Sequence, residues 1–125
     1  MKKIFQILII VAAGLVMNSC YYDEIQEAII PELPTDPEDP NFVEIKFGAD
    51  IQPIFTESCI QCHNASRNPD LRAGFAYSSL VPEYVIADDA DASQLYNKLA
   101  GGHQNLAQTK ITLIKTWINQ GAKNN

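Results

Sequence analysis

Three residues with chemically reactive side chains lie close together near the middle of the chain. Cys59, Cys62 and His63 are spaced as C-x-x-C-H, which is the attachment signature of c-type haem. Two thiols three positions apart lie on one side of a helical turn, where they can form thioethers with the two vinyl groups of one porphyrin. His63 then lies beneath the ring and can ligate the iron. The motif therefore predicts one covalently attached haem c.

Three other uses of the two thiols fit the same spacing. Cys59 and Cys62 could form a disulfide if the chain is exported, because that setting is oxidising. A thioredoxin-like redox pair accompanies a βαβ pattern, and no segment of this sequence shows sustained strand alternation. Closed zinc sites use two spaced ligand pairs; His63 or His103 could contribute, but the sequence has no second pair. The haem interpretation is favoured over all three.

The N-terminal residues have the features of an export signal. Lys2 and Lys3 give the chain a basic start, and residues 4–16 are almost wholly apolar, a run shorter than the roughly 20 residues that span a bilayer. The segment ends at Cys20 and resembles a bacterial lipoprotein signal, in which cleavage before a cysteine leaves that cysteine lipidated. The resemblance implies a signal peptide over residues 1–19 and an exported, membrane-anchored lipoprotein that faces the periplasm or the cell surface. A cleaved signal without lipid is the alternative.

Residues 20–41 are expected to be a disordered tether. The part from Pro31 to Pro40 contains four prolines and four acidic residues. Proline removes backbone donors and like charges repel one another, so the segment is predicted to be extended. At about 3.1 Å per residue, a tether of roughly twenty residues could hold a domain up to about 60 Å from the membrane. Residues 42–125 remain for one folded domain, and a domain of that size often needs a staple such as a covalent cofactor.

Helices are predicted throughout residues 42–125. Asp50 is a candidate N-cap for a first helix that continues to about residue 59. Asp91 or Ser93 can begin a second helix, which ends before the two glycines at 101 and 102. A third helix has apolar residues at positions 113, 114, 117 and 118 on one face and ends before Gly121. A short helical turn is expected within residues 73–80. The fold class predicted is all-α.

Residues 50–55, 59–63, 93–99 and 111–122 together carry a pattern that is similar to a known family. They resemble the small class I c-type cytochrome domains of bacterial exported lipoproteins. The resemblance implies an all-helical domain in which the first and last helices pack together and haem fills the core. It also implies transfer of single electrons to and from partner redox proteins. The sequence contains no nucleophile–base constellation that would indicate an enzyme.

The second iron ligand is where this chain departs from that family. Such domains usually offer a methionine before the last helix, but Met1 and Met17 are the only methionines and both lie in the signal peptide. The only other histidine is His103, in the pliable loop 101–105, and neutral imidazole is a good iron ligand. We therefore predict ligation of the iron by His63 and His103. The alternative is an open distal site, which would make the protein a haem-based sensor of gaseous ligands.

Charge and a few single residues complete the expectations. The formal net charge of −6 gives no support for nucleic-acid binding, which needs a basic face. Arg67 and Arg72 follow the motif and could pair with haem propionates, although solvated arginines are commoner. Pro69 could offer its carbonyl to the second ring nitrogen of His63. Trp117 is expected in the core.

Replacing Cys20 with serine tests the lipid anchor. Without the thiol no lipid can be attached, so we expect the protein to be released from membranes or to remain unprocessed. The haem domain should stay folded, because the tether separates it from the anchor. Membrane fractionation measures the release. Mass spectrometry that finds an unmodified mature N-terminus in the wild type would refute the anchor.

Overall fold

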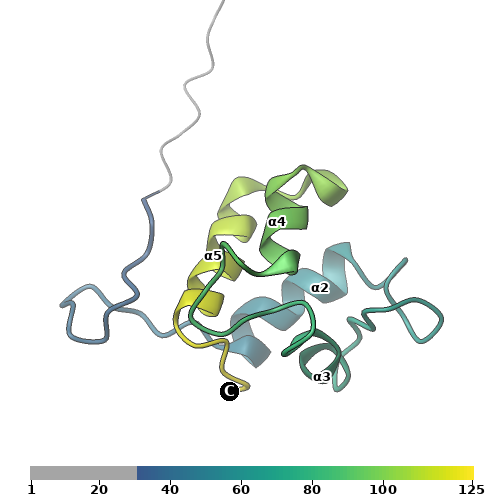
Figure 1. The fold of residues 1–125 in the computed structure, drawn as a ribbon, viewed down its shortest axis with the longest axis horizontal. Coiled ribbons are helices and arrows are strands. Elements are labelled where there is room, and N and C mark those ends of the chain that lie inside the picture. The colour runs from purple at the N-terminus through teal and green to yellow at the C-terminus, as the bar shows by residue number, and fades with distance from the viewer. Residues whose placement is uncertain (1–30) are drawn as a thin grey trace, which may run out of the picture.

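Short helices joined by irregular loops make up residues 31–125, the part of the chain that the computed structural model describes (Figure 1). They are η2 (Phe47–Ile51), α2 (Gln52–Ser58), α3 (Ala76–Leu80), α4 (Gln94–Ala100), η3 (His103–Asn105) and α5 (Gln108–Asn119). Within this range the only β-pairing is an isolated bridge between Ile86 and Asp89, so the all-α fold class is confirmed. The predicted signal peptide and the predicted lipidation site at Cys20 lie outside the described residues. None of the helices in residues 31–125 has the length and apolar character needed to cross a membrane.

The first helical segment begins earlier than predicted. Asp50 is not the N-cap of α2 but lies inside the π-helical turn η2, which continues directly into α2. Its carboxylate accepts a hydrogen bond from the N–H of Lys46 at 2.7 Å, so it caps the chain four residues upstream. Asn125 accepts from the N–H groups of Phe47 and Gly48, both at 2.9 Å. The contact between the two ends of the domain therefore supports a helix start at Phe47.

The other predicted helices are confirmed. Ser93 is the N-cap residue of α4, and its buried hydroxyl donates to the carbonyl of Asp89 at 2.7 Å. α4 ends before the two glycines, and α3 lies within the predicted turn. Beyond α5, Gly121 has a φ of 95°, a left-handed conformation that glycine adopts without the steric cost of a Cβ.

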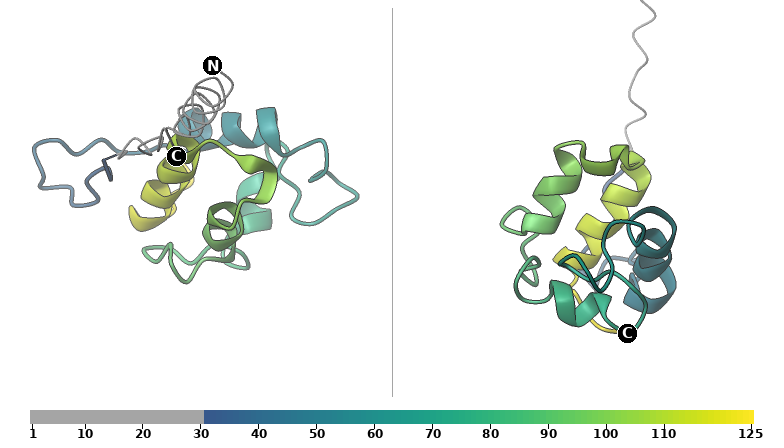
Figure 2. Two further views of the ribbon diagram at one scale, coloured as in Figure 1. Left: turned by 90° about the horizontal axis from the view of Figure 1, so that it is seen from above. Right: turned by 90° about the vertical axis from the view of Figure 1, so that its right-hand side faces the viewer.

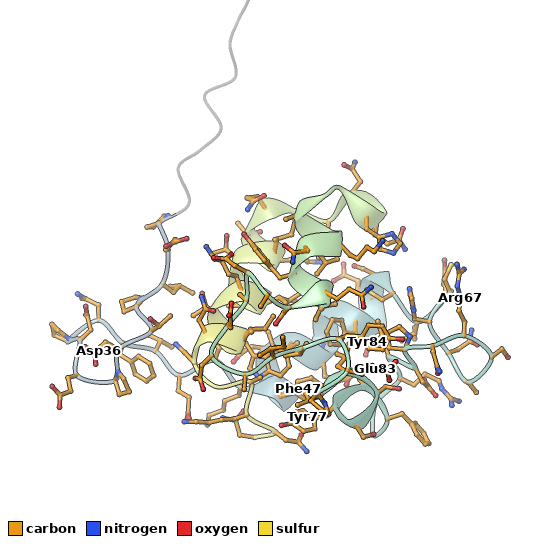
Figure 3. The ribbon with its side chains drawn as sticks, viewed as in Figure 1. Asp36, Phe47, Arg67, Tyr77, Glu83 and Tyr84 are labelled. Carbon is orange, nitrogen blue, oxygen red and sulfur yellow. The ribbon has the colours of Figure 1, made fainter. Side chains whose placement is uncertain are left out.

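The core lies between the η2–α2 segment and α5. Trp117 is fully buried, and its ring centroid lies 5.2 Å from that of Phe47. Phe47 also packs edge-on against Tyr77, with ring centroids 5.3 Å apart; the two residues are labelled near each other in Figure 3. The indole N–H of Trp117 donates to the carbonyl of Lys123 at 3.0 Å, so Trp117 is a core residue as predicted. The buried apolar residues are Ile45, Phe47, Ile51, Ile54, Phe55, Cys59, Leu71, Ala76, Leu80, Val85, Ala90, Leu99, Ile111, Ile114, Trp117, Ile118 and Ala122.

Part of the proline-rich segment contacts α5 and the residues after it. The side chain of Gln120 accepts from the N–H of Ile45 at 2.8 Å and donates to the carbonyls of Pro34 and Val43 at 3.1 and 3.0 Å. Lys115 forms an ion pair with Glu32 at 2.7 Å. The chain between these contacts loops out from the helices (Figure 2). These contacts thus hold part of the proline-rich segment against α5 and the residue that follows it.

Replacing Gln120 with alanine should lower the free energy of unfolding by about 1–3 kcal/mol, because three hydrogen bonds of about 0.5–1.5 kcal/mol each are lost and not all are independent. Guanidinium unfolding followed by Trp117 fluorescence measures the change. Gln108→Ala, at an exposed position in the first turn of α5, is the matched control and should change stability by less than about 0.5 kcal/mol. Equal losses in the two variants would contradict the role of Gln120.

Candidate functional site

The C-x-x-C-H motif forms a tight turn where α2 ends. The N–H groups of Cys62 and His63 both donate to the carbonyl of Cys59, at 3.1 and 2.9 Å. This turn gives the two free thiols different surroundings: Cys59 is 6% exposed, and Cys62 is exposed to solvent. One sulfur therefore belongs to the core, and the other lies at the surface of the same turn.

The imidazole of His63 is held in one orientation. Its Nδ1 lies 3.2 Å from the carbonyl oxygen of Pro69. Because a carbonyl can only accept, Nδ1 carries the proton and Nε2 keeps the lone pair with which histidine binds a metal. The loop that carries Pro69 is tied back to the motif and to α2, since Leu71 donates to the carbonyl of His63 at 3.1 Å and accepts from the side chain of Gln52 at 3.0 Å. The contact suggested for Pro69 and His63 is confirmed.

The loop between α4 and α5 brings the second histidine beside the first. Gly102, with a φ of 86°, turns the chain after α4, and His103 begins η3. The ring centroids of His63 and His103 lie 6.2 Å apart, with the planes inclined at 75°. Two metal–nitrogen bonds of about 2 Å and two ring radii of about 1 Å would separate imidazole centroids across one metal ion by about 6 Å. The observed centroid spacing therefore matches that of two imidazoles that share one metal ion.

A cavity of about 270 Å³ lies beside the two histidines. Its walls come from α2, the loop after the motif, α4, the 103–106 segment and α5. Arg67 and Lys98 are the only charged side chains among its lining residues, although the chain carries a net charge of −6. The complete lining is Phe55, Cys59, His63, Arg67, Asn68, Pro69, Leu71, Leu80, Tyr84, Gln94, Leu95, Lys98, Leu99, His103, Gln104, Leu106 and Ile114. An apolar ligand that carries negative groups suits such a cavity.

The two arginines suggested from the sequence differ in their surroundings. Arg72 forms an ion pair with Asp70 at 2.7 Å and stacks over the ring of Phe75, and its hydrogen bond lowers the pKa of Asp70 below the ordinary value. Arg67 lines the cavity and lies on the loop beyond α2 (Figure 3). Sequence reasoning missed Lys98. The signal that could have found it is its position three residues after Leu95, which places the two side chains on the same face of a helix.

The described residues offer one pair of facing histidines rather than a closed metal cage. Between residues 31 and 125, no group of three or more histidine, cysteine, aspartate or glutamate side chains is placed to hold a metal ion. A structural zinc ion needs four such ligands, so this part of the chain does not provide a closed zinc site. A haem iron takes only its axial ligands from the protein, and two histidines are enough for that.

Comparisons of the chain with protein-family models, with curated proteins and with solved structures found no match. Function must therefore be argued from the motif and from the geometry around the two histidines.

The thiols of the haem-free chain should react at different rates. Burial raises the pKa of the Cys59 thiol, and the positive charge of Lys110 offsets part of that rise. The thiolate is the reactive form, so iodoacetamide at about pH 8 should modify the exposed Cys62 several-fold faster than Cys59. Peptide mass spectrometry of a time course measures both rates. The single variants Cys59→Ser and Cys62→Ser serve as controls, and equal rates would contradict the different burial of the two sulfurs.

Proposed function

We propose that the protein is a monohaem c-type cytochrome, exported and tethered to a membrane through lipid on Cys20, that transfers single electrons outside the cytoplasm. The observation that carries the proposal is the pairing of His63 with His103 beside the C-x-x-C-H turn and the cavity. Its partners would be redox proteins. Electron transfer needs no nucleophile or general base, so the proposal does not include an enzymatic reaction.

The residues of the turn and of the 101–105 loop would hold one haem c. The thiols of Cys59 and Cys62 would form the two thioether bonds. His63, whose proton is on Nδ1, would ligate through Nε2, and His103 would supply the second axial nitrogen. When bound, haem supplies an iron ion that cycles between the ferric and ferrous states.

The remaining contributions of the chain are electrostatic and steric. Arg67 and Lys98 line the cavity and would pair with the propionate carboxylates, in charge-assisted hydrogen bonds that are stronger than neutral ones. The hydrogen bond from His63 to Pro69 would hold the imidazole in one orientation toward the iron. The apolar walls lower the local dielectric. The iron potential would therefore respond to the two imidazoles, the burial and the two cations.

A haem-based sensor of gaseous ligands is the second candidate, and one observation favours it. His103 is exposed, and the two residues that follow it, Gln104 and Asn105, have left-handed φ values of 63° and 49°. A non-glycine residue costs free energy in this conformation. A loop with that cost can release His103 and leave the distal iron position open to carbon monoxide or another small ligand.

Haem should be covalently attached. Expression with a haem-maturation system should yield coloured protein that keeps its colour through acid–acetone extraction, because the thioethers survive the loss of the axial ligands. Cys59→Ala or Cys62→Ala should weaken or abolish stable attachment. Colourless wild-type protein with a Cys59–Cys62 disulfide would rule out the cytochrome proposal.

Axial ligation by His103 can be separated from an open site. Ferrous wild type should resist carbon monoxide, whereas His103→Ala should bind it at least about tenfold more readily, because its distal position is always vacant. His103→Met, if the longer side chain reaches the iron, should raise the potential, since a methionine ligand raises it relative to histidine. Absorption spectra and redox titration give both results. Equal binding of carbon monoxide by wild type and His103→Ala would favour the sensor.

A further inference from the structure

The loop that carries His103 is joined to the end of α2 by one side-chain hydrogen bond. The amide nitrogen of Gln104 donates to the carbonyl oxygen of Ser58 at 2.8 Å, across 46 positions of sequence. Ser58 is the last residue of α2 and directly precedes Cys59. This contact therefore joins the residue after one histidine to the turn that carries the other histidine and both thiols.

The carbonyl of Ser58 is available because of how α2 ends. In a continued helix it would accept from the N–H of Cys62, four residues on. That N–H instead donates to the carbonyl of Cys59, as does the N–H of His63. The side chain of Gln104 supplies the donor that the helix does not, which satisfies a carbonyl at the helix terminus.

The backbone around His103 needs such a contact to keep its shape. Gly102, Gln104 and Asn105 all have positive φ values, of 86°, 63° and 49°, and only the first of them is a glycine. Left-handed non-glycine residues persist where the surrounding structure holds them in place. The N–H of Asn105 donates to the carbonyl of Gly102 within the loop, but that bond does not join the loop to α2. Gln104 makes a side-chain link from the loop to the end of α2.

We propose that Gln104 is a positioning residue that holds His103 in place as an iron ligand, and that breaking its bond to Ser58 opens the distal position to small ligands. The inference rests on the proposed ligation by His103. It makes the electron carrier and the ligand sensor two states of one loop, with the closed state favoured by a single hydrogen bond.

Two variants of Gln104 separate this bond from the shape of the backbone. Gln104→Asn keeps an amide, and asparagine tolerates the left-handed conformation, but its side chain is one methylene shorter. Gln104→Glu keeps the length, but the carboxylate cannot donate to a carbonyl. Glu57→Gln is the matched control, because it breaks the exposed ion pair between Glu57 and Lys110 near the same end of α2 without touching the loop.

The experiment measures the rate of carbon monoxide binding to the haem-loaded, ferrous full-length protein. Both Gln104 variants should bind about two- to tenfold faster than wild type, because loss of one hydrogen bond raises the open fraction by about that factor. Glu57→Gln should stay within about twofold of wild type. Unfolding midpoints recorded in parallel show whether a variant has lost stability throughout the domain rather than only the hydrogen bond to Ser58.

The outcomes distinguish the positioning role of Gln104 from the ligation of the iron by His103. If His103→Ala binds fast while wild type and both Gln104 variants are equally slow, the positioning role of Gln104 is wrong and the ligation by His103 stands. If wild type already binds as fast as His103→Ala, ligation by His103 is wrong, and the inference fails with it. Faster binding in Glu57→Gln, equal to that in the Gln104 variants, would show that any loosening of this end opens the site and would overturn a specific role for Gln104.

Discussion

The double acceptance of hydrogen bonds by the carbonyl of Cys59 is the interaction on which the rest of the site depends. Because this carbonyl accepts from the N–H groups of both Cys62 and His63, α2 ends in a turn and does not continue as a helix. The turn buries one thiol and exposes the other, and it brings His63 to Pro69 and to the cavity. It also leaves the carbonyl of Ser58 without its helical donor.

The domain positions this turn by joining its two ends. Asn125 caps the start of η2, and Trp117 packs on Phe47. α5 thereby holds the η2–α2 segment, and α4, which lies beside α5 (Figure 1), contributes residues to the cavity lining. A domain built from short helices gains rigidity from contacts between residues that are distant in sequence.

Local signals were enough to predict much of this fold, and distant contacts account for what they missed. α4 and α5 were predictable because Ser93, Gly101 and Gly121 mark their ends. The start of the first helical segment at Phe47 was not predictable from local sequence, because it depends on a contact with Asn125. The motif residues and His103 were found by type and spacing, whereas Gln104 has no distinctive signal in the sequence: its role follows only from the proximity of a loop and a helix end 46 positions apart.

If Cys20 carries lipid as proposed, the contacts of Glu32 with Lys115 and of Pro34 with Gln120 limit how far the domain can travel from the membrane. Eleven residue steps separate Cys20 from Pro31. Because a fully extended chain covers at most about 3.6 Å per residue, the chain between these two residues spans no more than about 40 Å. The docked segment and the end of α2 lie on opposite sides of the molecule (Figure 1). If Cys20 carries lipid as proposed, the turn that carries Cys62 and His63 therefore lies on the side of the domain away from the docked segment.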